Sequence, residues 1–62
     1  MLHKSDYIII AEAINKAIEL FYKDGMVPIE IVQVVENLVS AFYDNNPGFD
    51  SDRFRRACYG KN

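Results

Sequence analysis

The sequence predicts an all-α protein in which a helical hairpin and a short third helix assemble into a homo-oligomeric bundle. Apolar residues recur at helical spacing in two long segments, and glycine, proline and asparagine interrupt the pattern between them. Half of the 62 residues are hydrophobic, which is more apolar surface than so short a chain buries by itself. We therefore expect a single helical domain over residues 1–62, with helices at about 6–23, 28–44 and 51–59.

The first predicted helix has an apolar surface wider than one partner helix covers. Ser5 is a suitable N-cap, and Asp6 places a negative charge in the first turn, where the helix dipole favours it. One sector of the helix is polar and the opposite sector is apolar: Glu12, Asn15, Lys16, Glu19 and Lys23 against Tyr7, Ile10, Ala11, Ile14, Ala17, Ile18 and Phe21. Ala13 and Leu20 widen the apolar arc beyond the ~100° stripe of an ordinary surface helix. We expect this arc to form core or a subunit interface, and Gly25 to end the helix in the left-handed conformation.

The second predicted helix begins at Pro28, because a missing N–H costs nothing at the first helical position. The β-branched run at 29–35 leaves a strand open as an alternative there. The spacing of the pair Val34-Val35 from the pair Leu38-Val39 favours a helix. Its polar side chains share one sector, and its apolar side chains spread over the rest: Glu30, Gln33, Glu36, Asn37 and Ser40 against Ile31, Val32, Val34, Val35, Leu38, Val39, Ala41 and Phe42.

The segment that follows contains a turn and the start of the third helix. Asn46 precedes a proline and is therefore kept out of the helical region. Asp50 is the expected N-cap, and Phe49 and Phe54 have the spacing of a hydrophobic staple. We expect Gly60 to stop this helix, and we expect its inward side chains to be Phe54, Ala57 and Cys58.

The composition argues against several classes of protein. Cys58 is the only cysteine and His3 the only histidine, so neither an internal disulfide nor a metal or cofactor site is expected. We expect no enzyme activity, because Cys58 lies on the inward stripe without a base and the carboxylates lie on polar faces. No stretch approaches the ~20 apolar residues of a membrane span, and no secretory signal is present. A single thiol is typical of the reducing cytoplasm.

The charge is unevenly distributed along the chain. The formal net charge is −2, but residues 1–52 carry three lysines against nine carboxylates, and residues 53–62 carry three arginines and a lysine with no carboxylate. The tail is therefore the candidate anion-contact region. Arginine can hold phosphate through two parallel hydrogen bonds, and tyrosine can stack on a base. The predicted site for a nucleotide-like ligand comprises Arg53, Arg56, Arg55, Tyr43, Tyr59, Asn45 and Asn46. The alternative is that the arginines pair with the acidic helix faces, within or between subunits.

The tail resembles that of a large group of short phage and prophage proteins, which end in a pattern like Asn-Pro-Arg-Phe-Asp-x-x-Arg-Phe-x-x-Ala-Cys. The matching residues are Asn46-Pro47, Phe49-Asp50, Arg53-Phe54 and Ala57-Cys58, and Gly48 stands where that pattern usually has arginine. Ser5-Asp6-Tyr7 loosely resembles the group's opening segment. The resemblance implies a phage accessory protein. Small helical phage proteins that oligomerise include some that sequester nucleotide signals of host immunity without cleaving them, and others that block a defence protein by contact.

We therefore expect a homo-oligomeric counter-defence protein in the host cytoplasm that sequesters a nucleotide-derived immune signal. The expected partners are further copies of the chain and a nucleotide-like small molecule, with no membrane. The alternative is a protein–protein inhibitor or adaptor whose acidic faces dock on a basic host surface. A DNA-binding regulator would need a basic recognition helix, but the second helix is acidic and the third is short, so we do not expect nucleic acid as a partner.

Overall fold

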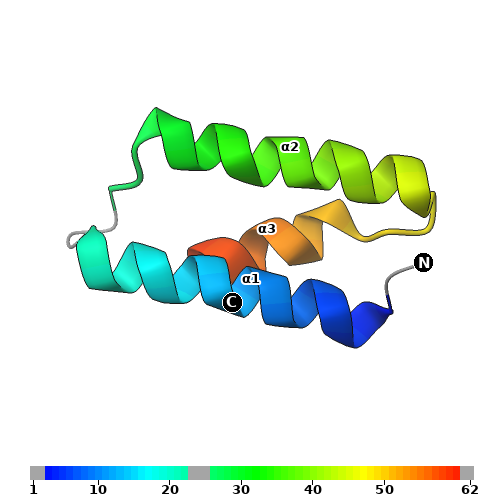
Figure 1. The fold of residues 1–62 in the computed structure, drawn as a ribbon, viewed down its shortest axis with the longest axis horizontal. Helices are drawn as coiled ribbons and strands as arrows, with labels where there is room; N and C mark the ends of the chain where they lie inside the picture. The colour runs from blue at the N-terminus through cyan, green and yellow to red at the C-terminus, as the bar shows by residue number, and fades with distance from the viewer. Residues whose placement is uncertain (1–2, 23–25, 61–62) are drawn as a thin grey trace.

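The computed structural model is all-helical over the residues that it describes, 3–22 and 26–60. Its helices are α1 (Lys4–Phe21), α2 (Ile29–Asn45) and α3 (Ser51–Tyr59). The two long helices run antiparallel, and α3 returns in the same direction as α1 (Figure 1). The stretch 29–35, where a strand was the alternative, is helical throughout. Within the described ranges, none of the helices is both long and apolar enough to cross a membrane.

α1 begins two residues earlier than predicted, because His3 rather than Ser5 is its N-cap. The Asp6 carboxylate accepts a hydrogen bond from the backbone N–H of His3 at 2.9 Å. A carboxylate three residues into a helix can satisfy the N-cap amide in this way, so Asp6 fixes the start of the helix. The helix ends at Phe21. The predicted stop at Gly25 lies outside the described residues.

α2 begins at Ile29, one residue later than predicted, because Pro28 is extended and serves as the N-cap. The Pro28 carbonyl accepts hydrogen bonds from the backbone N–H groups of Ile31 and Val32 at 3.0 and 3.2 Å. At the other end, Asn46 precedes Pro47 and is extended as predicted. The prediction of a helix from the spacing of apolar residues is therefore confirmed, with small shifts of its bounds.

α3 has its predicted bounds, and each of its local stop and start signals is confirmed. The Asp50 carboxylate accepts a hydrogen bond from the backbone N–H of Arg53 at 3.1 Å, which makes Asp50 the N-cap. The rings of Phe49 and Phe54 lie 5.6 Å apart, so they form the hydrophobic staple. Gly60 ends the helix in the left-handed conformation, with φ of 71°.

The core gathers where α3 packs against both long helices. The Cα atoms of α1 and α2 stay more than 8 Å apart along the two helices, so these helices meet through large side chains. The rings of Tyr7 and Phe42, for example, lie 4.9 Å apart. The core residues are Tyr7, Ala11, Val35, Val39, Phe42, Phe49, Phe54 and Cys58. Ala57 was predicted to point inward, but it is exposed, because it lies beside a hollow between α3 and α1.

Candidate functional site

A hollow of about 510 Å³ lies between the first half of α1, the turn after α2, and α3. Its volume falls within the range of about 300–1,000 Å³ that is typical of small-molecule sites. One group of lining residues is apolar or aromatic, and the other is polar or charged: Tyr7, Ile8, Ala11, Phe49, Phe54 and Ala57, and Lys4, Asn46, Gly48, Asp50 and Arg53. A hollow of this composition suits an organic anion with an apolar or aromatic body.

Two cationic side chains from opposite ends of the chain line the hollow. Arg53 comes from the first turn of α3, and Lys4 is the first residue of α1. Both side chains are exposed, and neither forms an ion pair with a described residue. Sequence reasoning missed Lys4, because only the packing of α3 against α1 places it near Arg53. An anion in the hollow would therefore meet positive charge from two helices.

Tyr7 contributes a buried polar atom to the same wall. Only 9% of the residue is exposed, and its hydroxyl is buried with no hydrogen-bond partner among the described residues. Its ring is held by Phe42 and Phe49, at centroid distances of 4.9 and 4.7 Å. A buried polar group that stays unpaired costs about 1–3 kcal/mol. Sequence reasoning treated Tyr7 as part of an apolar face and gave it no role at a site.

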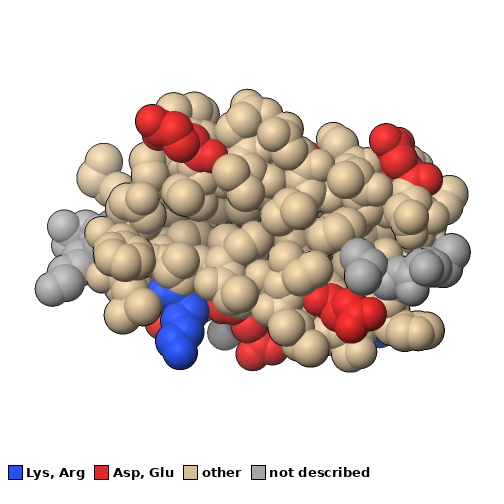
Figure 2. All heavy atoms as spheres, in the orientation of Figure 1, with Lys and Arg blue, Asp and Glu red and all other residues tan. Residues whose placement is uncertain are grey.

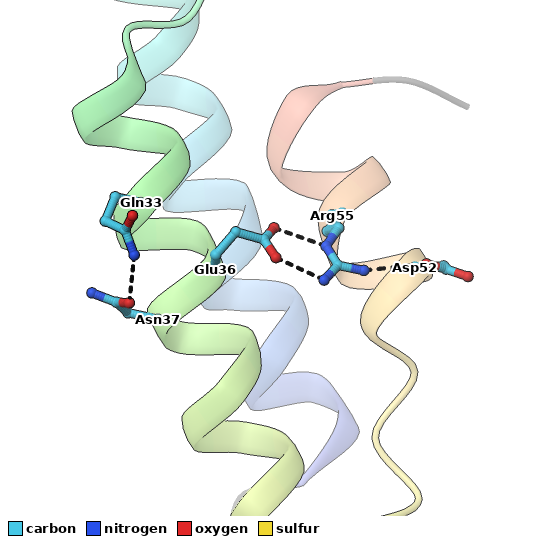
Figure 3. Close-up of polar contacts among 5 residues, drawn as sticks. All are labelled: Gln33, Glu36, Asn37, Asp52 and Arg55. Atoms are coloured by element: carbon cyan, nitrogen blue, oxygen red, sulfur yellow. Dashed lines mark hydrogen bonds and ion pairs between the residues drawn. The ribbon is translucent and has the colours of Figure 1, made fainter.

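Arg55 is engaged in an ion pair with Glu36 of α2 (Figure 3). Its Nε donates to Oε2 of Glu36 at 2.8 Å, and its Nη2 donates to Oε1 at 2.7 Å. Its Nη1 also donates to the Asp52 carboxylate at 3.3 Å. The hydrogen bonds from Arg55 hold the pKa of the Glu36 carboxyl below its usual value. For Arg55 the predicted alternative, pairing with an acidic helix face, is therefore confirmed.

The other predicted site residues do not converge on the hollow. Of the seven, only Arg53 and Asn46 line it, and the Asn46 Oδ1 already accepts a hydrogen bond from Gly48 at 3.1 Å. Arg56, Tyr43 and Asn45 are exposed elsewhere. Tyr59 lies on the side of α3 that faces α2, where burial and then the Glu36 carboxylate raise the pKa of its hydroxyl. A turn of about 100° per residue explains why neighbours in the sequence separate in this way.

The remaining groups to consider are the Cys58 thiol and the side chains that could bind a metal ion. Cys58 is fully buried, and this burial raises the pKa of its thiol to about 11. A thiol in this state is neither a nucleophile nor a metal ligand at neutral pH. Within 3–22 and 26–60, no three histidine, cysteine or acidic side chains lie close enough together to hold a metal ion.

Comparisons with protein-family models, with curated proteins and with solved structures gave no match for this chain. The hollow and the pattern of the tail are therefore the two features of this chain that point to a function.

Proposed function

We propose that this chain is a small homo-oligomeric protein that binds a nucleotide-derived signalling molecule and sequesters it without cleaving it. The observation that carries the proposal is the hollow, where two cations accompany aromatic walls. Arg53 would hold a phosphate through two parallel N–H donors, and Lys4 would add a second positive charge. The base or ribose would lie against the aromatic wall that Tyr7, Phe49 and Phe54 form.

The groups around the hollow favour binding over catalysis. Asp50 is the only carboxylate among its lining residues, and its Oδ1 is used as the N-cap of α3. General acid–base catalysis needs a positioned group that is free to exchange a proton, and the lining residues include neither histidine nor cysteine. The expected action is therefore to lower the free concentration of the ligand.

We propose a phage origin for this chain from the pattern of its tail. One residue that departs from that pattern lies at the hollow. Gly48, which stands where the pattern usually has arginine, lines the hollow together with Arg53. A side chain at position 48 would therefore reach the same ligand. We expect Gly48→Arg to tighten the binding of a phosphate-bearing ligand, because it adds a third cation next to the two already present.

Calorimetric titration of the purified protein with cyclic nucleotides and ADP-ribose derivatives tests the proposal. We expect one of them to bind with Kd below ~100 μM, which is about −5.5 kcal/mol. Arg53→Gln should weaken that binding by about tenfold or more, which is the loss of about 1.4 kcal/mol. Arg56→Gln is the matched control, since it removes the same charge from the same helix but lies outside the hollow. Equal losses in the two variants, or no ligand from this class, would contradict the proposal.

Tyr7→Phe tests the buried hydroxyl separately from the ring that lines the hollow. Removing a buried unpaired hydroxyl should stabilise the free protein by about 1 kcal/mol. The aromatic ring is kept and the hydroxyl is inaccessible from the hollow, so the ligand affinity should change by less than about twofold. A loss of affinity of about tenfold would contradict this and show that the ligand reaches the hydroxyl.

A protein–protein inhibitor or adaptor is the second candidate, and exposed carboxylates on both long helices favour it. Glu12 and Glu19 on α1 and Glu30 and Asp44 on α2 are exposed, and none of them forms an ion pair within the described ranges. Such faces would dock on a basic host protein through contacts that weaken with salt. Pull-down from host lysate separates the candidates, because a stoichiometric partner that survives nucleotide removal would favour the inhibitor.

A further inference from the structure

The two long helices carry apolar stripes that the described chain leaves mostly uncovered. On α1 the stripe consists of Ile9, Ala13, Ala17 and Leu20, all exposed, and Ile9 and Leu20 are 63% and 64% exposed. On α2 it consists of Val34 and Ala41, which are exposed, and Leu38, which is half-buried. Within each helix these residues recur at three- and four-residue steps, so each set forms one continuous stripe.

The contacts with α3 show where these stripes point. On α1, Asn15 donates a hydrogen bond to the Cys58 carbonyl of α3 at 3.1 Å. On α2, Glu36 pairs with Arg55 of α3. Ala13 and Val34 each lie two residues before these contacts, which is a rotation of about 160° around the helix. Both stripes therefore lie on the side of the α1–α2 pair that is remote from α3, and together they form what we call the open face.

The open face is poor in charge. In Figure 1 the end of α3 passes behind α1, so Figure 2 shows the side of the molecule that carries the open face. This side is largely uncharged, and the acidic and basic groups visible on it lie mostly toward its margins (Figure 2). Two copies can meet through a surface of this kind about a two-fold axis without opposing like charges.

We propose that the open face joins two copies of this chain into a dimer in which α1 and α2 of each copy form a four-helix layer. The molecule extends 34 × 20 Å across this face, or roughly 600 Å² in projection, so two such faces can remove at most about 1,200 Å², which reaches the lower end of stable specific interfaces. Ala13, Ala17 and Ala41 are small enough to let the helices of the two copies approach closely. The face gives the homo-oligomeric part of the proposed function a specific interface.

The dimer would leave both ligand sites accessible. The hollow is lined by α3 and by the side of α1 that contacts α3, whereas the open face lies on the opposite side. The dimer therefore carries two outward-facing hollows and binds one ligand per chain. Because the two surfaces share no residue, failure of the ligand proposal leaves the dimer untouched, and failure of the dimer leaves the hollow intact.

Sedimentation equilibrium or light scattering tests the interface directly. The 7.1 kDa chain should show a doubled mass at micromolar concentration. Val34→Lys places a charge within the open face and should return the protein to a monomer. Gln33→Lys adds the same charge at the preceding position of α2, which is also exposed but lies outside the stripe. This control variant should stay dimeric. A wild-type monomer at ~100 μM, an interaction no tighter than about −5.5 kcal/mol, would overturn the proposal. So would a dimeric Val34→Lys variant.

Thiol protection tests the same interface in a milder variant, in case Val34→Lys fails to fold. The variant Ala13→Cys places a thiol within the open face. Because the native Cys58 is buried and unreactive, a thiol reagent modifies only this new cysteine, and its rate shows whether the face is covered. Its modification should slow by about tenfold or more when the concentration is raised until the protein is dimeric. The Ser40→Cys thiol, at an exposed position of α2 outside the stripe, should react at one rate throughout. An A13C rate that is independent of concentration would overturn the proposal.

Discussion

Arg55 on α3 holds Glu36 on α2 through two parallel hydrogen bonds of 2.8 and 2.7 Å. α3 packs more extensively on α1 than on α2. Among the described residues, the side-chain hydrogen bonds between α3 and α2 are those of this pair. It also divides the arginines of the tail by role. Arg55 supports the fold, whereas Arg53 lies on the opposite side of α3 and lines the hollow.

The Arg55–Glu36 pair should contribute measurably but modestly to stability. The two side chains are 36% and 40% exposed, so solvent screens them, and we expect a coupling energy of about 0.5–1 kcal/mol. A double-mutant cycle with Arg55→Ala and Glu36→Gln, followed by chemical denaturation, measures it. Arg56→Ala is the control and should change stability by less than about 0.5 kcal/mol. A coupling energy of zero would mean that the pair does not persist in solution.

The same pair should make stability depend on pH on the acid side. Arg55 lowers the pKa of Glu36 from its ordinary value of 4.5. The ionised carboxylate is thus favoured in the folded state, so its contribution is complete above that value and is lost as the pH falls through the lower, folded pKa. Denaturation of wild type and Glu36→Gln at several pH values checks this. The difference between the two proteins should be constant near neutral pH and shrink below pH 4.5; a constant difference at all pH values would contradict the assignment.

Cys58 should resist thiol reagents for as long as the chain is folded. With a pKa of about 11, only about one thiol in a thousand is ionised at pH 8, against roughly a quarter for an exposed cysteine. We expect modification of the native protein to be at least about 100-fold slower than in guanidinium. Because the folded pKa is raised, this group's contribution to stability is lost as the pH rises from about 9 toward 11. Rapid modification of the native protein would show that the core around Cys58 opens readily.

Gly60 and Gly48 should respond differently to alanine. Gly60 has φ of 71°, and an added Cβ would lie 2.8 Å from the Asn15 Nδ2, which donates the hydrogen bond to Cys58 of α3. We expect Gly60→Ala to lower the free energy of unfolding by about 1–2 kcal/mol. Gly48 has no positive φ, and its added Cβ would lie 3.4 Å from Asn46, so Gly48→Ala should stay within about 0.5 kcal/mol. Thermal unfolding of the two variants compares them, and equal losses would mean that Gly60 does not fix the end of α3.

The local structure of this chain could be predicted from its sequence, because short-range contacts determine it. The turn at Asn46-Pro47, the Asp50 cap, the staple of Phe49 and Phe54 and the stop at Gly60 each involve residues within a few positions of one another. The error at the start of α1 was local too. Asp6 reaches back to His3, and this contact moves the N-cap two residues from Ser5.

The sequence by itself determined the helices, the caps of α3 and which side chains share a sector, because a rotation of about 100° per residue follows from the backbone alone. The tertiary structure decided what each sector meets. Periodicity could not tell that Arg55 would reach Glu36, that Arg53 would join Lys4 and Tyr7 at one hollow, or that Ala13 and Val34 would stay uncovered. Those outcomes depend on the side from which α3 packs against α1 and α2. That choice is made by the buried aromatic side chains of all three helices together, and no single helix specifies it.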